Sequence, residues 1–253
     1  MNVVGMGGGS RTPGVKAAHG LSGQEHPNVL IVPTACSLRS SFDRKVPQIV
    51  KFFSNLGLST NVLHQFSEQP SKEKIASTLG TATLIYTIGG NAPYMLKQMK
   101  ASGLDTALAT AIKQGVVHVG TSAGALLPFA QMHINPSNRP KKELWDFDYA
   151  DGLSIVTAVA TAHANGHDKT MSGLLRPDTR FDHLLRTFPA EAQYGLAIDN
   201  GAAVILGDNP GVALADPNAM TGIRLLDRRP DGQIDVRLVE DSSQLLCLPL
   251  NLS

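Results

Sequence analysis

Short apolar runs that alternate with amphipathic segments constrain the fold of this chain more than any other feature. Continuous apolar runs cover 2–6, 28–35, 83–90 and 115–120, a pattern typical of strands buried on both faces, and 59–66 is a further strand candidate. Apolar residues at helical spacing occupy 42–56, 71–79, 93–100, 104–113 and 123–131. Strands that alternate with helices form right-handed βαβ units. The first half therefore predicts an α/β protein with a mostly parallel sheet sandwiched by helices.

The second half has a different pattern. Residues 131–150 form a polar, proline-containing loop, an apolar strand run follows over 153–162, and a helix is expected over 178–188. Four short β runs after residue 194 are separated by turn residues, which indicates a C-terminal antiparallel β extension. Because neither a linker nor an internal repeat interrupts the pattern, we expect residues 1–253 to form a single α/β domain.

Composition narrows the classes of function. The formal net charge of +1 offers no broad basic field for nucleic acid or an anionic membrane. Because no run approaches the roughly 20 apolar residues of a membrane span and the first residues lack a basic signal region, a cytoplasmic location is expected. Cys36 and Cys247 are far apart and stand outside any Cys/His cluster, so neither a disulfide framework nor a zinc site is predicted.

Ser122 stands in the sequence GTSAG (120–124), between a buried strand run and an expected helix. A sharp strand-to-helix turn with small neighbours exposes a serine hydroxyl as a nucleophile, and the first N–H groups of the helix can stabilise negative charge. The N–H of Ala123 is the natural oxyanion donor. The alternative is that Ser122 only caps the helix, because serine is a preferred N-cap residue.

A serine nucleophile needs a base and a group that orients it. His163 ends an apolar strand run and is favoured over His167, which lies further into the loop, because strand ends hold side chains more rigidly. Asp199 ends another strand and is the favoured acid, although Asp in the sequence DNG is also typical of a hairpin turn. Asp151 is the alternative acid. This machinery needs no metal or cofactor, because it already supplies nucleophile, proton transfer and charge stabilisation.

The segment 83–127 resembles the S51 serine peptidases, which include dipeptidase E and the cyanophycinases. The matching motifs are Gly89-Gly90-Asn91 after a strand and Gly120-Thr121-Ser122-Ala123-Gly124-Ala125 at the turn; a looser match covers 151–206. The resemblance implies a class I glutamine amidotransferase-like (flavodoxin-like) fold. It also implies that Ser122 is the nucleophile, that His163 is the base, and that Gly90 and Ala123 supply the oxyanion N–H groups.

The resemblance further implies a small peptide substrate, with removal of an N-terminal aspartyl residue from dipeptides as the expected reaction. A cyanophycinase-like β-aspartyl isopeptidase and a non-catalytic amidotransferase-like binding protein are the alternatives. Asn91, Arg176 and Arg180 are the candidate substrate-binding residues, since a carboxylate favours an arginine partner. In the loop 131–150, Trp145 and its aromatic neighbours suit either a roof over the site or a homodimer contact.

Four positions depart from the family pattern. Ile88 replaces the first glycine of the usual GGGN, and alanines flank His163 where the family usually has a proline and an aromatic residue. Asn200 stands where some members carry glutamate, so Asn200 is a further candidate for the group that orients the histidine.

Overall fold

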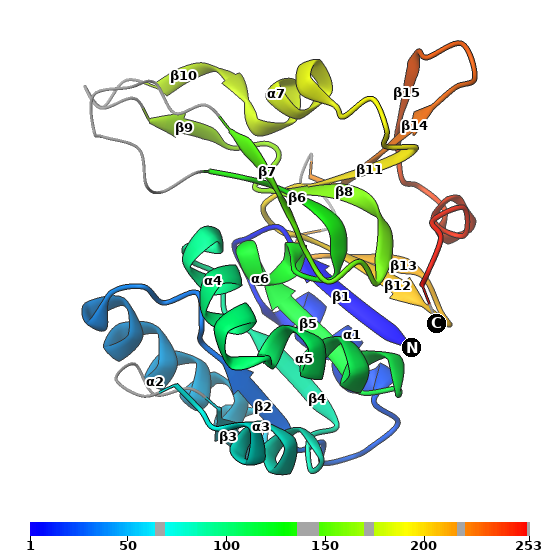
Figure 1. Ribbon diagram of the computed structural model, residues 1–253. Coiled ribbons are helices and arrows are strands. Elements are labelled where there is room, and N and C mark those ends of the chain that lie inside the picture. The colour runs from blue at the N-terminus through cyan, green and yellow to red at the C-terminus, as the bar shows by residue number, and fades with distance from the viewer. Residues whose placement is uncertain (64–68, 136–146, 170–174, 217–220, 252–253) are drawn as a thin grey trace.

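The fold is built on two mixed sheets. The computed structural model describes residues 1–63, 69–135, 147–169, 175–216 and 221–251. Figure 1 shows a seven-stranded sheet with its helices in the lower part of the molecule and a six-stranded sheet above it. The chain therefore has the α/β architecture that the alternating pattern predicts.

The seven-stranded sheet has the order β13-β12-β1-β5-β4-β2-β3. Its five parallel strands are β1 (Asn2–Met6), β2 (Val29–Val32), β3 (Thr60–Val62), β4 (Leu84–Thr87) and β5 (Val117–Thr121). Two antiparallel strands, β12 (Ala202–Gly207) and β13 (Gly211–Leu214), extend it beyond β1. The β2 and β4 strands are buried throughout, as expected for a sheet covered on both faces.

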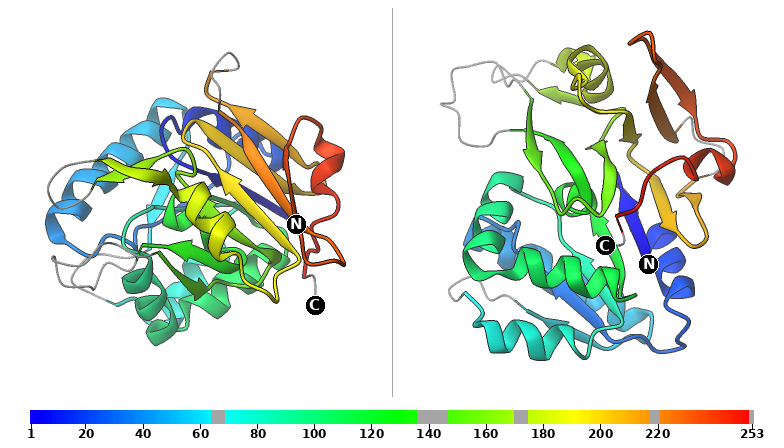
Figure 2. Two further views of the ribbon diagram at one scale, coloured as in Figure 1. Left: turned by 90° about the horizontal axis from the view of Figure 1, so that it is seen from above. Right: turned by 45° about the vertical axis from the view of Figure 1, so that its right-hand side comes forward.

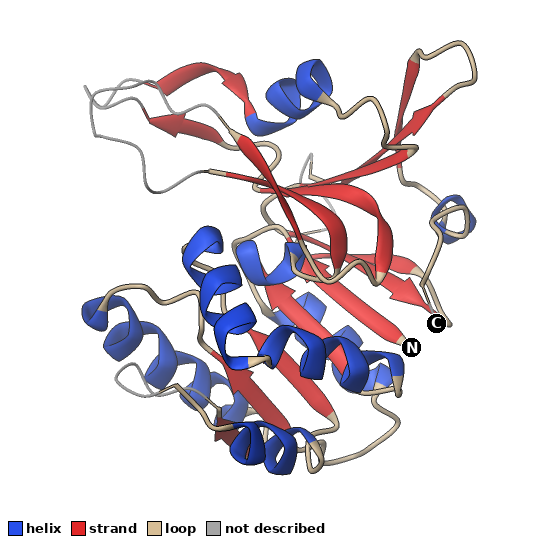
Figure 3. Cartoon of the chain, in the orientation of Figure 1, coloured by secondary structure: helices blue, strands red, loops and turns tan. Residues whose placement is uncertain are grey.

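Helices cover both faces of this sheet, as the blue helices and red strands of Figure 3 show. The apolar side chains of α1 (Thr12–Leu21) and α2 (Arg39–Asn55) belong to one core cluster with one face of the strands. A second cluster contains the opposite face together with α3 (Lys72–Leu79), α4 (Ala92–Ser102) and α5 (Leu104–Lys113). Ser71 caps α3, and Gly103 separates α4 from α5 at φ 74°.

The six-stranded sheet has the order β15-β14-β11-β8-β6-β7. The strands are β6 (Phe129–Ile134), β7 (Asp148–Asp151), β8 (Val156–Ala162), β11 (Tyr194–Ile198), β14 (Ile223–Arg228) and β15 (Ile234–Leu238). A short β9 (His167–Lys169) and β10 (Leu175–Thr179) ladder precedes α7 (Arg180–Thr187), and a 3₁₀ turn (Ser242–Leu245) lies near the C-terminus. Figure 2 shows the two sheets from above and after a 45° turn about the vertical axis.

Three expectations need correction. The helix predicted over 123–131 is a single turn, α6 (Ala123–Leu126), because Pro128 disfavours helix at the preceding residue and strand β6 starts directly after it. Helix α1 was not predicted. The C-terminal β segments are divided between the two sheets, and β11 pairs in parallel with β8 while β14 and β15 are antiparallel. Among the described residues, no helix is long and apolar enough to cross a membrane.

Candidate active site

Ser122 lies at the turn between β5 and α6, at the carboxyl end of the parallel strands. Its φ of 55° and ψ of −123° place a non-glycine residue in a strained region, as a nucleophile turn requires. A hydrogen bond from its backbone N–H to the Met6 carbonyl, 2.9 Å long, ties the turn to the neighbouring strand β1. The serine does not cap α6, since its side chain makes no cap hydrogen bond.

The small residues around Ser122 are required by close backbone contacts. A Cβ added at Gly120 would lie 2.2 Å from the Gly124 carbonyl oxygen, and one at Gly124 would lie 2.2 Å from the Thr87 oxygen. A Cβ at Gly89 would lie 2.8 Å from the Cβ of Ser122 itself. These distances are far below ordinary contact, so the glycines of both sequence motifs let the backbones pack together around the hydroxyl.

His163 follows β8 of the six-stranded sheet, so its side chain approaches Ser122 from the second sheet. Its Nε2 lies 2.9 Å from the Ser122 Oγ, and its backbone N–H donates to the Gly7 carbonyl over 3.1 Å. The φ of His163 is also 55°, so both side chains project from left-handed turns. The structure therefore places the predicted nucleophile and base within hydrogen-bond distance.

The Nδ1 atom of His163 faces Asn200. Its distance to the Asn200 Oδ1 is 2.6 Å. Both the backbone N–H and the Nδ2 of Asn200 donate to the Asn165 Oδ1, at 2.9 and 3.1 Å. Because the side-chain amide nitrogen of Asn200 donates to Asn165, the amide oxygen of Asn200 faces the imidazole of His163. The ring then carries its proton on Nδ1, and Nε2 is left to accept the Ser122 proton.

Asp199 is not the residue that orients the imidazole, contrary to the favoured assignment from sequence. Its buried carboxylate accepts from Arg224 Nη1 at 2.7 Å and from the Gly222 N–H at 3.1 Å. Asp199 and Asn200 are adjacent in the turn from β11 to β12, and the turn directs their side chains to different partners. Asp199 therefore fixes the turn that presents Asn200.

The other candidate residues lie elsewhere. Asp151 is exposed at the end of β7, where it pairs with Gln131, and the side chain of His167 lies outside the described part of the structure. His118 is fully buried in β5, with Nε2 3.0 Å from the Thr87 hydroxyl, so it belongs to the core. Burial lowers the pKa of His118 to about 3, so the ring is neutral at pH 7.

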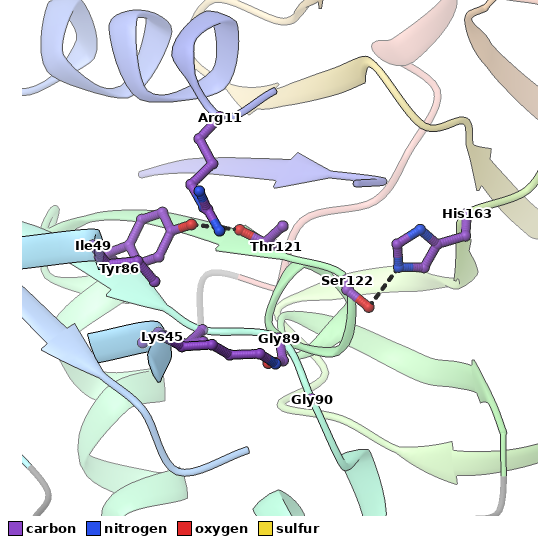
Figure 4. A pocket seen from close by; sticks show the side chains of 10 residues that line it. Arg11, Lys45, Ile49, Tyr86, Gly89, Gly90, Thr121, Ser122 and His163 are labelled. Carbon is purple, nitrogen blue, oxygen red and sulfur yellow. Dashed lines mark hydrogen bonds between the residues drawn. The ribbon is translucent and has the colours of Figure 1, made fainter. Parts of the chain in front are cut away.

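A pocket of about 240 Å³ opens beside Ser122 and His163 (Figure 4). Its wall contains Gly89 and Gly90, as the sequence motif predicts for the oxyanion region, and also four polar or charged residues that sequence reasoning missed: Arg11, Lys45, Tyr86 and Thr121. The Tyr86 hydroxyl lies 2.6 Å from the Thr121 Oγ1. Burial raises the pKa of Tyr86 despite the opposing effects of Thr121 and Arg11, so the phenol is protonated at pH 7.

Two of the predicted substrate-binding residues, Asn91 and Arg180, do not line this pocket. Asn91 caps α4, with its Oδ1 accepting from the Tyr94 N–H at 2.9 Å. Arg180 begins α7, and its guanidinium carbon lies 5.2 Å from the centre of the Phe147 ring. Arg176 is on β10, and its side chain lies outside the described residues.

Of the aromatic residues of the loop 131–150, Phe147 and Tyr149 lie in the described part of the structure. Trp145 lies outside the described residues. The Phe147 ring packs on His133, 4.8 Å between centroids, and the Tyr149 hydroxyl lies 2.8 Å from the Thr187 Oγ1. Phe147 and Tyr149 thus pack near α7 and β6, so they do not roof the pocket, and a homodimer stays a prediction. Within the described ranges, no group of three or more His, Cys, Asp or Glu side chains could hold a metal ion.

A serine at a strained strand-to-helix turn, paired with an imidazole from a second sheet, defines a hydrolase-type site on an α/β fold. The model of peptidase family S51 matches residues 8–211, and the chain belongs to this family. That match confirms the resemblance read from the two glycine motifs.

Proteins of known sequence and structure agree with this assignment. An uncharacterized peptidase of Listeria innocua is 32% identical over 116 residues, which are 46% of this chain and 54% of that protein, and one of Listeria monocytogenes is 29% identical over 116 residues, 46% and 55%. The chain thus spans about half the length of these curated relatives.

Two solved structures share the fold. A peptidase from an acI-B1 Actinobacterium superposes with a TM-score of 0.65 at 17% identity, over 95% of each chain. A "Putative Peptidase E Protein" from Listeria monocytogenes EGD-e superposes with a TM-score of 0.59 at 20% identity, over 85% of this chain and 98% of that one. At these identities the comparison shows the fold alone.

Proposed function

We propose that this protein is a serine peptidase that hydrolyses small peptides, with N-terminal aspartyl dipeptides as its substrates, through an acyl-enzyme on Ser122. The observation that carries the proposal is the 2.9 Å contact between the Ser122 Oγ and the His163 Nε2, with Nδ1 held by Asn200 at 2.6 Å. This is the arrangement in which a base can remove the hydroxyl proton and a third group fixes the tautomer.

In the first step, Ser122 attacks the scissile carbonyl while His163 takes its proton at Nε2. The developing oxyanion is bound by the N–H groups of Gly90 and Ala123. Losing one such donor typically costs about 10² to 10³ in rate. The imidazolium then gives its proton to the leaving amine, and the N-terminal residue remains on Ser122 as an ester. Water, deprotonated by the same ring, attacks the ester and releases the free amino acid.

Asn200 supports these steps as a neutral group. Its carbonyl oxygen orients the ring and accepts the Nδ1 proton, but it lacks the full negative charge that a carboxylate would place beside the imidazolium. The same combination of a nucleophile, a histidine and an asparagine occurs in other peptidases, with cysteine in place of serine. The contact to Asn165 is essential here, because an asparagine turned by 180° would present its NH₂ group and favour the wrong tautomer.

The size of the pocket supports a small substrate. Its volume of about 240 Å³ lies below the roughly 300–1,000 Å³ of typical small-molecule sites, which favours a short peptide over an extended one. Purified protein should be tested on Asp-Leu, Leu-Asp and β-aspartyl-arginine, with product amino acids quantified by chromatography. We expect turnover of Asp-Leu and its loss, by a factor of at least about 10⁴, in the Ser122→Ala variant.

Ser154→Ala is the matched control for this substitution. Ser154 also has a positive φ, 52°, but it lies in the loop before β8 and outside the pocket. Full turnover by Ser122→Ala would exclude the acyl-enzyme. Turnover of β-aspartyl-arginine with no action on Asp-Leu would replace the substrate by that of an isopeptidase. A folded protein that Ser122-directed fluorophosphonate does not label and that cleaves none of the three would favour a binding protein.

A further inference from the structure

The pocket beside Ser122 has a strongly positive wall. Arg11, the residue before α1, and Lys45, in α2, are both half-buried and both line it. Figure 4 shows the two side chains entering from opposite walls, Arg11 beside Tyr86 and Thr121, and Lys45 beside Gly89. The elements that carry them are separated by β2, so the fold rather than the local sequence brings them together.

Neither cation has an acidic partner among the described residues. The described residues that line the pocket include no Asp or Glu. Other cations of the described chain are paired: Arg39 with Asp43 at 2.9 Å and Arg224 with Asp199 at 2.7 Å are examples. Burying two like charges without a counter-ion is unfavourable, and an anionic ligand reverses that cost. The pocket is therefore organised for negative charge.

The donors of both groups suit a carboxylate. Lys45 Nζ donates one hydrogen bond to the Gly89 carbonyl, 2.8 Å, which fixes the ammonium and leaves two N–H bonds for a ligand. The planar guanidinium of Arg11 can bind both oxygens of a carboxylate. Ile49 and Ile88 form an apolar part of the same wall and reduce the access of water, which strengthens charge pairing.

We propose that Arg11 and Lys45 form an anion subsite that binds the side-chain carboxylate of the residue whose carbonyl Ser122 attacks. This inference rests on the proposed function and names the residues that select its substrate. The acyl residue is the part of the substrate that remains on Ser122, so a pocket with Ser122 in its wall receives the side chain of that residue. The subsite replaces the role first assigned from sequence to Arg176 and Arg180.

Asp-Leu and Asn-Leu test the subsite because the two dipeptides differ in charge with almost no change in shape. The ratio of their kcat/KM values should be measured for the wild type, Arg11→Gln and Lys45→Gln, since glutamine keeps a hydrogen-bond donor and removes the charge. We expect each substitution to lower the preference for Asp-Leu by about 10- to 100-fold, the usual contribution of a charge-assisted hydrogen bond. Arg44→Gln, one residue from Lys45 and exposed on α2, is the matched control and should keep the wild-type ratio.

A second measurement is independent of turnover. Binding of Asp-Leu and Asn-Leu to the Ser122→Ala variant should show the same preference, and adding Arg11→Gln or Lys45→Gln should remove it. If the wild type cleaves Asp-Leu and both variants keep its preference, the subsite is wrong and the proposed function stands. If Asp-Leu binds selectively through both cations but is never cleaved, the proposed function is wrong and the subsite stands.

A further substrate tests whether the two cations bind the C-terminal carboxylate of the dipeptide instead of its side-chain carboxylate. Asp-Leu amide lacks the C-terminal carboxylate and keeps the aspartyl side chain. We expect the cation variants to lose affinity for Asp-Leu amide as they do for Asp-Leu. A loss confined to the peptide with a free C-terminus would overturn the assignment, because the cations would then bind the leaving residue.

Discussion

Gly8 lies between the two side chains that orient each other at the site, which makes Gly8→Ala a sharp perturbation. A Cβ at this position would be 2.3 Å from the Asn200 Oδ1 and 2.4 and 2.5 Å from the His163 Cε1 and Nδ1. Ordinary contacts begin near 3.4 Å, so the imidazole and the amide would have to separate by about 1 Å. Their present 2.6 Å hydrogen bond could not persist.

Misplacing a catalytic group by this distance costs about 10²-fold, and we expect kcat/KM on Asp-Leu to fall by that factor or more. Crowding of this kind also destabilises the fold by about 1–3 kcal/mol, which thermal unfolding will report. Gly9→Ala is the control, because Gly9 has a positive φ of 76° but its added Cβ would meet only the Gly201 backbone, at 3.2 and 3.7 Å. Wild-type kcat/KM in Gly8→Ala, or equal losses in both variants, would refute the reasoning.

Three other perturbations have predictable signs. In Asn200→Asp, the new carboxylate stabilises the imidazolium and raises its pKa, so the acidic limb of the kcat/KM profile should move to higher pH, and an unchanged limb would contradict the role of this side chain. Arg224→Met leaves the Asp199 carboxylate buried without its ion pair and should lower the free energy of unfolding in urea by about 3 kcal/mol. Removing the more exposed ion pair between Arg237 and Asp227 should lower it by less than about 1 kcal/mol. For His118, the unfolded pKa of 6.5 exceeds the folded value of about 3, so the unfolded state binds the extra proton and stability falls as pH drops through that window. His118→Gln should reduce the fall in the free energy of unfolding between pH 6.5 and 4, measured by denaturant titration. An unchanged fall would contradict the role given to His118.

The sequence predicts the central sheet well, because strands buried on both faces and helices with one apolar face leave different periodicities. It predicts α1 poorly. The segment 12–21 contains two glycines, which lower helix propensity, and its main signal is Pro13 at the first turn. The helix expected after Ser122 ends early since Pro128 and strand β6 prevent its continuation.

The sequence motifs predict two members of the site, the nucleophile and the base. Ser122 follows a strand of the seven-stranded sheet and His163 follows a strand of the six-stranded sheet, and their side chains meet as expected. The third partner is not predictable, because Asp199 and Asn200 are neighbours and only the turn geometry decides which one faces the ring. The positive pocket leaves no local pattern either, because Arg11 precedes α1 whereas Lys45 lies in α2, far along the chain.

Ser122 follows a strand of the larger sheet, whereas His163 follows a strand of the smaller one, and Asn200 lies where the chain passes from one sheet to the other. The rate of turnover therefore depends on how the two sheets are positioned relative to each other. Any partial loosening of the smaller sheet separates base from nucleophile, while the core that α1 and α2 form with the larger sheet lies apart from it and persists. Inactivation at low denaturant should thus precede the loss of helical signal.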